Sequence, residues 1–346
     1  MFSVDTKSVL TQSESYRPFH FPWAIETAKK QVIDMTWDVH QIELQDDLRQ
    51  YNSKDGLATR NFSHEHNKKI VDTLSLSFTE MDRGVAQGYV KLIPYSKNNE
   101  VLTADITMAF KETIHQRAYA LAAESFGFTD ADWVAFKQYQ EMNAKIDAIS
   151  GSEEIDPSTR LGYCKLRTQI AMGEGIGLFG SFTSFLNFKR FGKLMGFNDV
   201  NSWSLSDETG HVEYNFRVIE NEEKLLSYVE RLELKKFTEQ VVENYVLAEH
   251  SFIDLIGDQE DLPREKLKEY IVYIGKLRLY QRNYLDFKEV PENPLDWMDH
   301  ILSAGKAENF FEKKVTSYSH QPLIGEIDYS GYATAALSRV IKYDLS

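Results

Sequence analysis

Residues 111–119 read Lys-Glu-Thr-Ile-His-Gln-Arg-Ala-Tyr, and residues 207–211 read Asp-Glu-Thr-Gly-His. Each stretch places a glutamate and a histidine three residues apart, so on a helix both side chains lie on one face, one turn apart. A carboxylate offered together with an imidazole is a ligand pair for iron, manganese or zinc. One such pair alone is more often an ordinary surface pair, but two copies in one chain favour a metal site.

Two further acidic residues lie in apolar surroundings. Glu174 is the one charged residue of the stretch 172–182, and burying it unpaired would cost several kcal/mol, so it needs a cation or a proton. The four glycines of that stretch each destabilise a helix by about 0.8–1 kcal/mol relative to alanine, which predicts close helix packing or a local bulge. Asp82 follows apolar positions between 71 and 78. Glu80 is the rival ligand, but two residues along a helix it points nearly the opposite way.

Together these residues match an arrangement found in di-iron and di-manganese carboxylate bundles. There, two helices each supply one carboxylate and two others each supply a Glu-x-x-His pair. Four carboxylates balance two divalent ions, so the buried site is formally neutral only with both metals bound. The sequence therefore predicts an all-α, ferritin-like helical bundle with a dinuclear metal site in its core. The expected metal ligands are Asp82, Glu112, His115, Glu174, Glu208 and His211.

The remaining pattern predicts long helices with short polar breaks. Residues 104–124 contain neither glycine nor proline and are rich in helix formers. Gly127 ends that helix, and Thr129 with Asp132 resembles a capping box for the next one. Further helices are expected at about 161–188, at about 200–221 and after Pro263. We expect one helical domain over residues 1–319 and a flexible tail over residues 320–346.

Composition and charge exclude several classes of function. The chain has 346 residues, 42% of them hydrophobic, which is enough to bury one large core or two modest ones. A net charge of −14 argues against a nucleic-acid groove, which relies on clustered lysine and arginine. No apolar run reaches the roughly 18–20 residues of a membrane span, and residues 1–16 lack the layout of a signal peptide. These observations predict a cytoplasmic protein that binds neither nucleic acid nor membrane.

The chain contains one cysteine, Cys164. It therefore forms neither an internal disulfide nor a thiol-based zinc site. Any chemistry that needs a pair of redox thiols must take place on another chain.

Tyr119 lies four residues after His115 and seven after Glu112, so the three share a helical face. A tyrosine beside a metal pair that activates oxygen could be oxidised to a phenoxyl radical, although an ordinary core tyrosine fits the spacing as well. Residues 112–119 resemble the Glu-x-x-His-x-x-x-Tyr signature of the small, radical-generating subunit of class I ribonucleotide reductase. Residues 207–211 resemble the second metal motif of that family. Segments similar to the family also occur at 35–37 with Glu43, at 293–297 and at 309–312.

This resemblance implies a role for each matching residue. Tyr119 would store the radical, and Asp207 would hydrogen-bond a metal-bound imidazole, expected to be that of His115, and reach Trp37, which gives a path for an electron and a proton. Ser204 is polar where many members carry apolar side chains, so a hydroxyl facing Tyr119 would change the hydrogen bonding or lifetime of the radical. One metal, nearer Tyr119, would bind to Asp82, Glu112 and His115, and the other to Glu174, Glu208 and His211.

The resemblance also implies cofactors and partners. Two metal ions per chain are expected, with iron the first choice and manganese or a mixed Mn/Fe pair left open, together with oxygen for radical generation. Manganese would call for a flavoprotein activase. The expected partners are a cysteine-bearing large subunit and a second copy of this chain. Family members dock on the large subunit through a tail with a relay tyrosine, for which the candidates are Tyr329, Tyr332 and Tyr343.

Other classes of protein are weighed against this one. A different dimetal-carboxylate oxidase on the same bundle, such as a ligand-binding oxidase or a monooxygenase component, would need a substrate cavity at the metals and no docking tail. Metal-storage bundles of the ferritin type are much shorter and do not call for Trp37 or Asp207. A helical interaction protein with incidental ligands is the remaining alternative.

Overall fold

The computed structural model describes residues 8–11, 19–141, 143, 145, 148 and 155–302. In these ranges the chain forms helices and no β-strand, apart from an isolated bridge between Gln259 and Leu262. The all-α prediction is therefore confirmed. The predicted tail with its three tyrosines, and the segment 309–312, lie outside the described residues, so the domain boundary at residue 319 stays a prediction.

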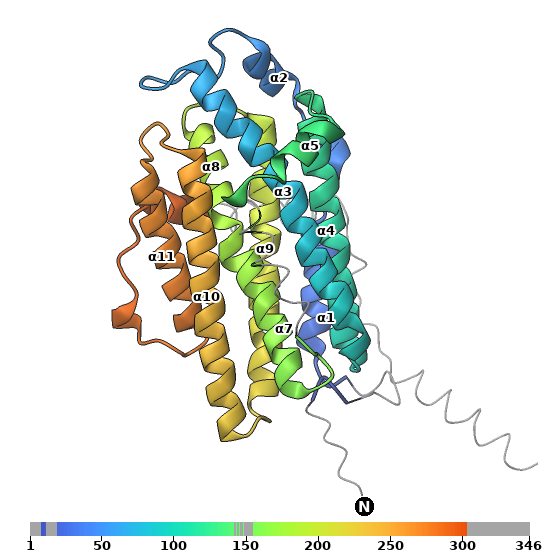
Figure 1. Ribbon diagram of the computed structural model, residues 1–346. Helices are drawn as coiled ribbons and strands as arrows, with labels where there is room; N and C mark the ends of the chain where they lie inside the picture. Colours follow the sequence, from blue (N-terminus) through green and yellow to red (C-terminus); the bar gives the residue numbers. More distant parts are fainter. Residues whose placement is uncertain are drawn as a thin grey trace, which may run out of the picture. The chain divides into compact units, whose positions relative to one another are not determined.

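Long helices of the bundle carry five of the six predicted ligands, and Figure 1 shows these helices running lengthwise beside one another. Helix α3 packs mainly against α4, and α7 packs mainly against α9. A further pair, α10 and α11, lies next to α7 and the π-helix η5. The bounds of these elements are α3 (His64–Leu92), α4 (Asn99–Ser125), α7 (Arg160–Met172), η5 (Gly173–Gly177), α9 (Met195–Glu223), α10 (Tyr228–Ile256) and α11 (Arg264–Gln281).

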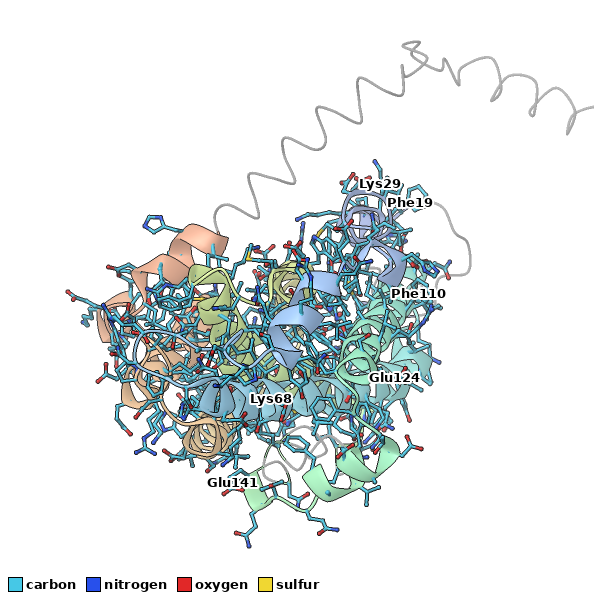
Figure 2. All side chains as sticks on the ribbon, turned by 90° about the horizontal axis from the view of Figure 1, so that it is seen from above. Phe19, Lys29, Lys68, Phe110, Glu124 and Glu141 are labelled. Atoms are coloured by element: carbon cyan, nitrogen blue, oxygen red, sulfur yellow. The ribbon has the colours of Figure 1, made fainter. Side chains whose placement is uncertain are left out.

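Shorter elements close the ends and one side of the bundle. Helix α1 packs on α4, α2 packs on α9, and α8 continues beyond the π-helix. Seen from above in Figure 2, side chains fill the space between the helices, while Phe110 and Glu124 of α4 are directed outward. The bounds are α1 (Pro22–Lys29), η1 (Lys30–Asp34), η2 (Val39–Gln41), α2 (Gln45–Asn52), η3 (Ile93–Tyr95), α5 (Asp130–Phe136), α8 (Phe179–Arg190) and η6 (Phe287–Glu289).

Most of the helices predicted from the sequence are confirmed. The helix expected at 104–124 is α4, and its start is capped by Asn98, whose side chain accepts hydrogen bonds from two backbone amides of the first turn. Gly127 adopts a φ of 96°, and the capping box of Thr129 with Asp132 is complete. The helix expected at about 200–221 is α9, and the one after Pro263 is α11. None of the helices in the described ranges has the length and apolar character needed to cross a lipid bilayer.

The single helix predicted at about 161–188 is wrong in one respect, because the π-helix η5 interrupts it. The predicted bulge accounts for the interruption. A Cβ added at Gly173 would lie 3.0 Å from the hydroxyl of Tyr245, and one added at Gly177 would lie 3.0 Å from the same ring. The glycines thus let Tyr245 of α10 pack directly on the π-turn, and this packing offsets their low helix propensity.

The N-terminus of α9 is capped from another helix. Leu194 at the cap position has a φ of 53° and gives no side-chain hydrogen bond. The buried carboxylate of Asp47 in α2 instead accepts hydrogen bonds from the amides of Gly196, at 3.3 Å, and Phe197, at 2.6 Å. An anion at a helix N-terminus is also favoured by the helix dipole. This contact fixes the segment that follows Trp37 onto the helix that carries Asp207.

We expect Gly196→Ala to destabilise the fold. The new Cβ would lie 2.0 Å from the carbonyl oxygen of Glu43, a backbone atom that cannot turn aside. The expected loss is about 1–3 kcal/mol of unfolding free energy, measured by urea denaturation. Gly210→Ala in the same helix is the matched control, because its Cβ would meet the side-chain nitrogen of Gln31, at 2.6 Å, and this group can move. Equal losses of unfolding free energy in the two variants would show that the clash with the Glu43 carbonyl is not what destabilises Gly196→Ala.

Candidate metal centre

The six predicted ligands come together in the interior of the bundle. Asp82 lies on α3, Glu112 and His115 on α4, Glu174 on η5, and the last pair on α9. Each of the six side chains is at most 1% exposed. Six ionisable groups in an apolar interior require compensation, since burying an unpaired charge costs several kcal/mol.

The cluster divides into two overlapping groups. In each group, one potential ligand atom from every residue lies within 4.8 Å of the others. Glu112 and Glu208 belong to both groups, so each can supply one oxygen to either metal position. The sequence had divided the ligands into two separate sets of three, and the structure adds this sharing. The groups are Asp82, Glu112, His115 and Glu208, and Glu112, Glu174, Glu208 and His211.

Several ligand atoms converge without hydrogen-bonding. His115 Nδ1 lies 3.0 Å from Glu208 Oε1, and His211 Nδ1 lies 3.0 Å from Glu112 Oε1. Yet His115 Nδ1, Glu208 Oε1, both oxygens of Glu112 and Asp82 Oδ2 have no hydrogen-bond partner in the described part of the chain. Buried polar atoms are nearly always partnered. Unpartnered oxygen and nitrogen atoms aimed at common points fit two ions that accept nitrogen and oxygen ligands.

Glu80, the rival of Asp82, lies outside this cluster. Its oxygens pair with Lys137 Nζ at 2.7 Å and with Arg83 at 3.1 Å. Its charge is therefore balanced at the edge of the bundle, while Asp82 on the opposite face of α3 reaches the interior.

The electrostatics of the metal-free cluster favour bound protons. Burial, together with the neighbouring carboxylates, raises the pKa of Glu174 to about 8 and raises that of Asp82 well above its usual range. Burial lowers the pKa of His115 and His211, but the surrounding carboxylates outweigh it and raise both pKa values well above the usual range. Protons thus occupy the cluster where cations would otherwise balance its charge.

Tyr119 lies beside the first of the two groups. Its side chain is fully buried, and its ring stacks on Phe78 at a centroid distance of 4.2 Å and an interplanar angle of 6°. Burial raises the pKa of the phenol well above its usual value, the charge of Asp82 raises it further, and the hydroxyl of Ser204 partly offsets the rise. Ser204 therefore faces Tyr119, although neither hydroxyl completes a hydrogen bond within the described ranges.

Asp207 connects Trp37 to the cluster. Its Oδ2 accepts a hydrogen bond from the indole Nε1 of Trp37 at 2.9 Å and lies 3.1 Å from His115 Nε2. The Trp37 ring also stacks on the imidazole of His115 at 5.6 Å and 8°. His115 thus turns one nitrogen to Asp207 and the other to the carboxylates. Burial raises the pKa of Asp207, but the contacts with His115 and Lys111 outweigh it and leave the pKa below its usual range.

Two residues at the site were missed by the sequence reasoning. Lys111 is 2% exposed and places its Nζ 2.8 Å from Asp207 Oδ2. The hydroxyl of Tyr89 lies 3.4 Å from Glu174 Oε2. Helical spacing could have indicated both, because Lys111 precedes His115 by four residues and Tyr89 follows Asp82 by seven, which places each on a ligand-bearing face.

Comparison with known proteins identifies the family. The family model for the small chain of ribonucleotide reductase matches residues 13–294. This chain belongs to the ribonucleotide reductase small-chain family. A probable ribonucleoside-diphosphate reductase small subunit of Invertebrate iridescent virus 3 is 26% identical, over 92% of this chain and 87% of that protein. The family and the name of this relative support the same enzyme class, an oxidoreductase, for this ribonucleotide reductase small chain.

Solved structures show the same fold. The R2 subunit of ribonucleotide reductase from Clostridium botulinum aligns with a TM-score of 0.72 at 17% identity, over 85% of this chain and 94% of that one. A protein from Bacillus halodurans described as a class I ribonucleotide reductase aligns with a TM-score of 0.72 at 18% identity, over 81% of this chain and 100% of that one. The fold of this small chain is thus the helical bundle of R2 proteins, and the family and the buried cluster together indicate a dimetal site.

We expect metal binding to release protons and to strengthen as the pH rises. Groups whose pKa is raised, such as Glu174 at about 8, hold protons at neutral pH that must leave before the atoms can bind a cation. The apparent affinity for Mn(II) should rise about tenfold per pH unit for each proton released, up to the pKa of the releasing group. Titration calorimetry in buffers of different ionisation enthalpy measures the number of protons. Glu80→Gln should bind identically, and pH-independent binding to the wild-type protein would contradict the prediction.

Proposed function

We propose that this chain is the radical-generating small subunit of a class I ribonucleotide reductase. The observation that carries the proposal is the buried cluster of four carboxylates and two histidines beside Tyr119, in a chain of this family. Two metal ions bound there, iron by first choice, would supply the activation of oxygen and the oxidising equivalent. Manganese with a flavoprotein activase, or a mixed Mn/Fe pair, is the second choice, because the same nitrogen and oxygen ligands suit both metals.

The surroundings of Tyr119 suit a stored radical. Oxidation of the phenol removes one electron and the hydroxyl proton, and leaves a neutral phenoxyl radical on the ring. Phe78 stacks on that ring, and Phe197 lies at a centroid distance of 5.8 Å, so aromatic side chains exclude water from two sides. Asp82 is the charged group that acts most strongly on the phenol. We assign it as the acceptor of the hydroxyl proton once metal binding has displaced its own proton.

The contacts of Asp207 suit the transfer of the radical away from the site. The hydrogen bonds from His115 and Trp37 meet at one oxygen of Asp207, so the imidazole and the indole are joined through a single carboxylate. Trp37 is 6% exposed, whereas His115 is fully buried, so this path leads from the cluster toward the edge of the bundle. We therefore assign Trp37 and Asp207 to the relay that passes the radical on.

A large subunit completes the proposed reaction. Reduction of a ribonucleotide by this family needs redox thiols, and this chain has one cysteine. Burial raises the pKa of the Cys164 thiol to about 12, so it remains a protonated and unreactive side chain. The reduction must therefore take place on a cysteine-bearing partner. We assign the docking role to residues 320–346, with Tyr329, Tyr332 and Tyr343 as candidates for the tyrosine that receives the radical.

A homodimer is a further part of the proposal. The outer face of α4 carries Ile106, at 52% exposure, and Phe110, at 60% exposure, one turn apart. Exposed apolar side chains that gather on one helix face often mark a contact with another protein. An apolar face is also where two copies of a chain with a net charge of −14 would repel each other least.

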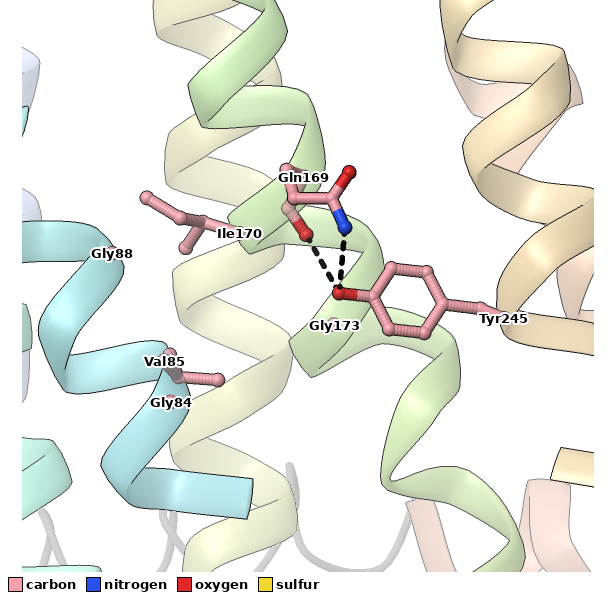
Figure 3. Close-up of a pocket in the computed structure, with 7 residues that line it drawn as sticks. All are labelled: Gly84, Val85, Gly88, Gln169, Ile170, Gly173 and Tyr245. Carbon is pink, nitrogen blue, oxygen red and sulfur yellow. Dashed lines mark hydrogen bonds between the residues drawn. The ribbon is translucent and has the colours of Figure 1, made fainter. Parts of the chain in front are cut away.

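The cavity beside the π-helix does not favour a different oxidase. It is lined by Gly84, Val85 and Gly88 of α3, by Gln169, Ile170 and Gly173, and by Tyr245, whose hydroxyl hydrogen-bonds to Gln169 (Figure 3). Its volume is about 10 Å³, which holds no more than about one water molecule. This space is too small for an organic substrate, and none of the six predicted ligands lines it.

We expect Tyr119→Phe to abolish the radical and to leave two metals bound per chain. Metal-free protein is loaded with Fe(II) and exposed to oxygen, and electron paramagnetic resonance then measures the organic radical. Tyr270→Phe is the matched control, because Tyr270 is also fully buried and its hydroxyl also lacks a partner in the described residues. This control should retain the wild-type signal. A radical that survives in Tyr119→Phe would contradict the assignment of the radical to Tyr119. If the wild-type protein binds two irons but gives no radical signal, the same experiment is repeated with manganese and an activase.

We expect Ser204→Ala to alter the radical without preventing its formation. Loss of the hydroxyl removes a polar neighbour of the phenoxyl oxygen, so the largest g value should rise. The radical should also decay more slowly. High-field resonance measures the first effect and the decay of the signal at room temperature the second. Ser184→Ala in α8, which removes another buried and unpartnered hydroxyl, should change neither. An unchanged g value in Ser204→Ala would remove Ser204 from the site.

A further inference from the structure

Lys111 is a buried lysine that the ligand set does not use. It directly precedes Glu112 on α4, and its side chain is 2% exposed. The neighbouring Phe110 is directed outward in Figure 2, so of these two consecutive residues one is exposed and the other is buried. Lysine is almost never fully buried unless it is paired. Its contacts therefore indicate why it is inside.

The ammonium group of Lys111 joins two segments that are distant in the sequence. Its Nζ donates a hydrogen bond to the backbone carbonyl of Met35 at 2.9 Å and lies 2.8 Å from Asp207 Oδ2. Met35 directly follows η1, so the ammonium group also satisfies a carbonyl at the end of that turn. Trp37 is two residues further along. Lys111 thus contacts both sides of the Trp37–Asp207 hydrogen bond, the segment that carries the donor and the carboxylate that accepts it.

Three donors meet at one oxygen of Asp207. Lys111 Nζ, Trp37 Nε1 and His115 Nε2 lie 2.8, 2.9 and 3.1 Å from Oδ2, whereas Oδ1 has no partner in the described part of the chain. A carboxylate free to rotate would share its donors between both oxygens. The fixed ammonium group, strongly attracted to one oxygen, selects the orientation in which the indole and the imidazole meet at the same atom.

The charge of Lys111 also completes the balance of the site. Asp207 adds a fifth negative charge to the four ligand carboxylates, and two divalent ions supply four positive charges. Lys111 supplies the fifth. Its Nζ lies 5.5 Å from the centroid of the Trp37 ring, so the residue that balances Asp207 lies beside the indole as well.

From these contacts we infer that Lys111 is a positioning residue, which holds the Trp37 indole and the Asp207 carboxylate in the geometry that passes the Tyr119 radical out of the metal site. This inference rests on the proposed function, since it concerns the path by which that radical leaves. In the transfer, Trp37 gives up one electron to the phenoxyl radical of Tyr119, and the radical takes back the proton held by Asp82 and becomes a phenol again. Lys111 itself neither gains nor loses an electron.

Lys111→Met tests the inference, because methionine fills a similar volume without a donor or a charge. We expect it to bind two metals and to form the Tyr119 radical at a yield close to that of the wild type. With the large subunit present, turnover per radical should fall by about tenfold to a hundredfold, as expected when a reacting group is misplaced by about 1 Å. Equal turnover per radical in Lys111→Met and the wild type would overturn the inference.

A second measurement needs neither metal nor activity. The ultraviolet resonance Raman difference spectrum between metal-free protein and its Trp37→Phe variant isolates the indole N–H of Trp37 from the other four tryptophans. We expect Lys111→Met to shift that band toward a weaker hydrogen bond. A merely structural role for Lys111 would lower the melting temperature and leave the band in place, and that result would also overturn the inference.

Lys145→Met is the matched control for the loss of a buried ion pair. Lys145 is 1% exposed and pairs with Glu249 of α10 at 2.5 Å, and its Nζ lies over the ring of Phe252. This variant should change neither the Trp37 band nor turnover per radical. If Lys111→Met does not fold, Lys111→Gln decides the question, because its shorter amide cannot reach both Met35 and Asp207. We expect Lys111→Gln to shift the Trp37 band and to lower turnover per radical, both by less than Lys111→Met does. A Lys111→Gln variant that matches the wild type in both measurements would overturn the inference.

The outcomes separate this inference from the proposed function. A wild-type protein that forms no radical with either metal would contradict the proposed function, while the Raman band would still report whether Lys111 positions Trp37. A wild-type protein with a radical, together with a Lys111→Met variant that matches it in band and turnover, would leave the function standing and remove Lys111 from the path.

Discussion

The burial of four like-charged carboxylates in one apolar interior is the constraint on which the rest of the structure depends. Asp82, Glu112, Glu174 and Glu208 come from three helices and a π-turn, and each is shielded from water. Without cations the four carboxylates repel one another, and Asp82 and Glu174 retain protons because their pKa values are raised. The bundle can hold such a cluster because its helices are long and tightly packed on every side of it. The stability of this arrangement is therefore tied to what occupies the cluster.

The same constraint explains features at some distance from the ligands. The π-turn that carries Glu174 is packed against Tyr245, so the carboxylate is held by a rigid element rather than by a loop. Asp207 lies next to Glu208 in the chain and would add another charge to the interior, and Lys111 balances it. Asp47 fixes α2 to the start of α9. Each of these contacts restricts the position of a charged group or of the helix that carries it.

The ligands were predictable because helix geometry and polarity both mark them in the sequence. The two Glu-x-x-His pairs have helical spacing, and Glu174 is a lone charge among apolar residues. The break at Gly173–Gly177 was predicted only as a bulge within one helix, because its cause is a ring from α10, far along the chain. Lys111 was missed because an isolated lysine in a helix is normally at the surface. The sharing of Glu112 and Glu208 depends on how α4 and α9 are rotated toward each other, which no local pattern records.

That sharing has a consequence for how such a centre can change. In the proposed site, replacing Asp82 or Glu174 would remove a ligand from one metal position, whereas replacing Glu112 or Glu208 would remove one from both. The two positions are therefore not separable halves, because each shared glutamate belongs to both groups of ligands. Changes at Lys111 or Ser204, which belong to neither group, would leave both sets of ligands intact.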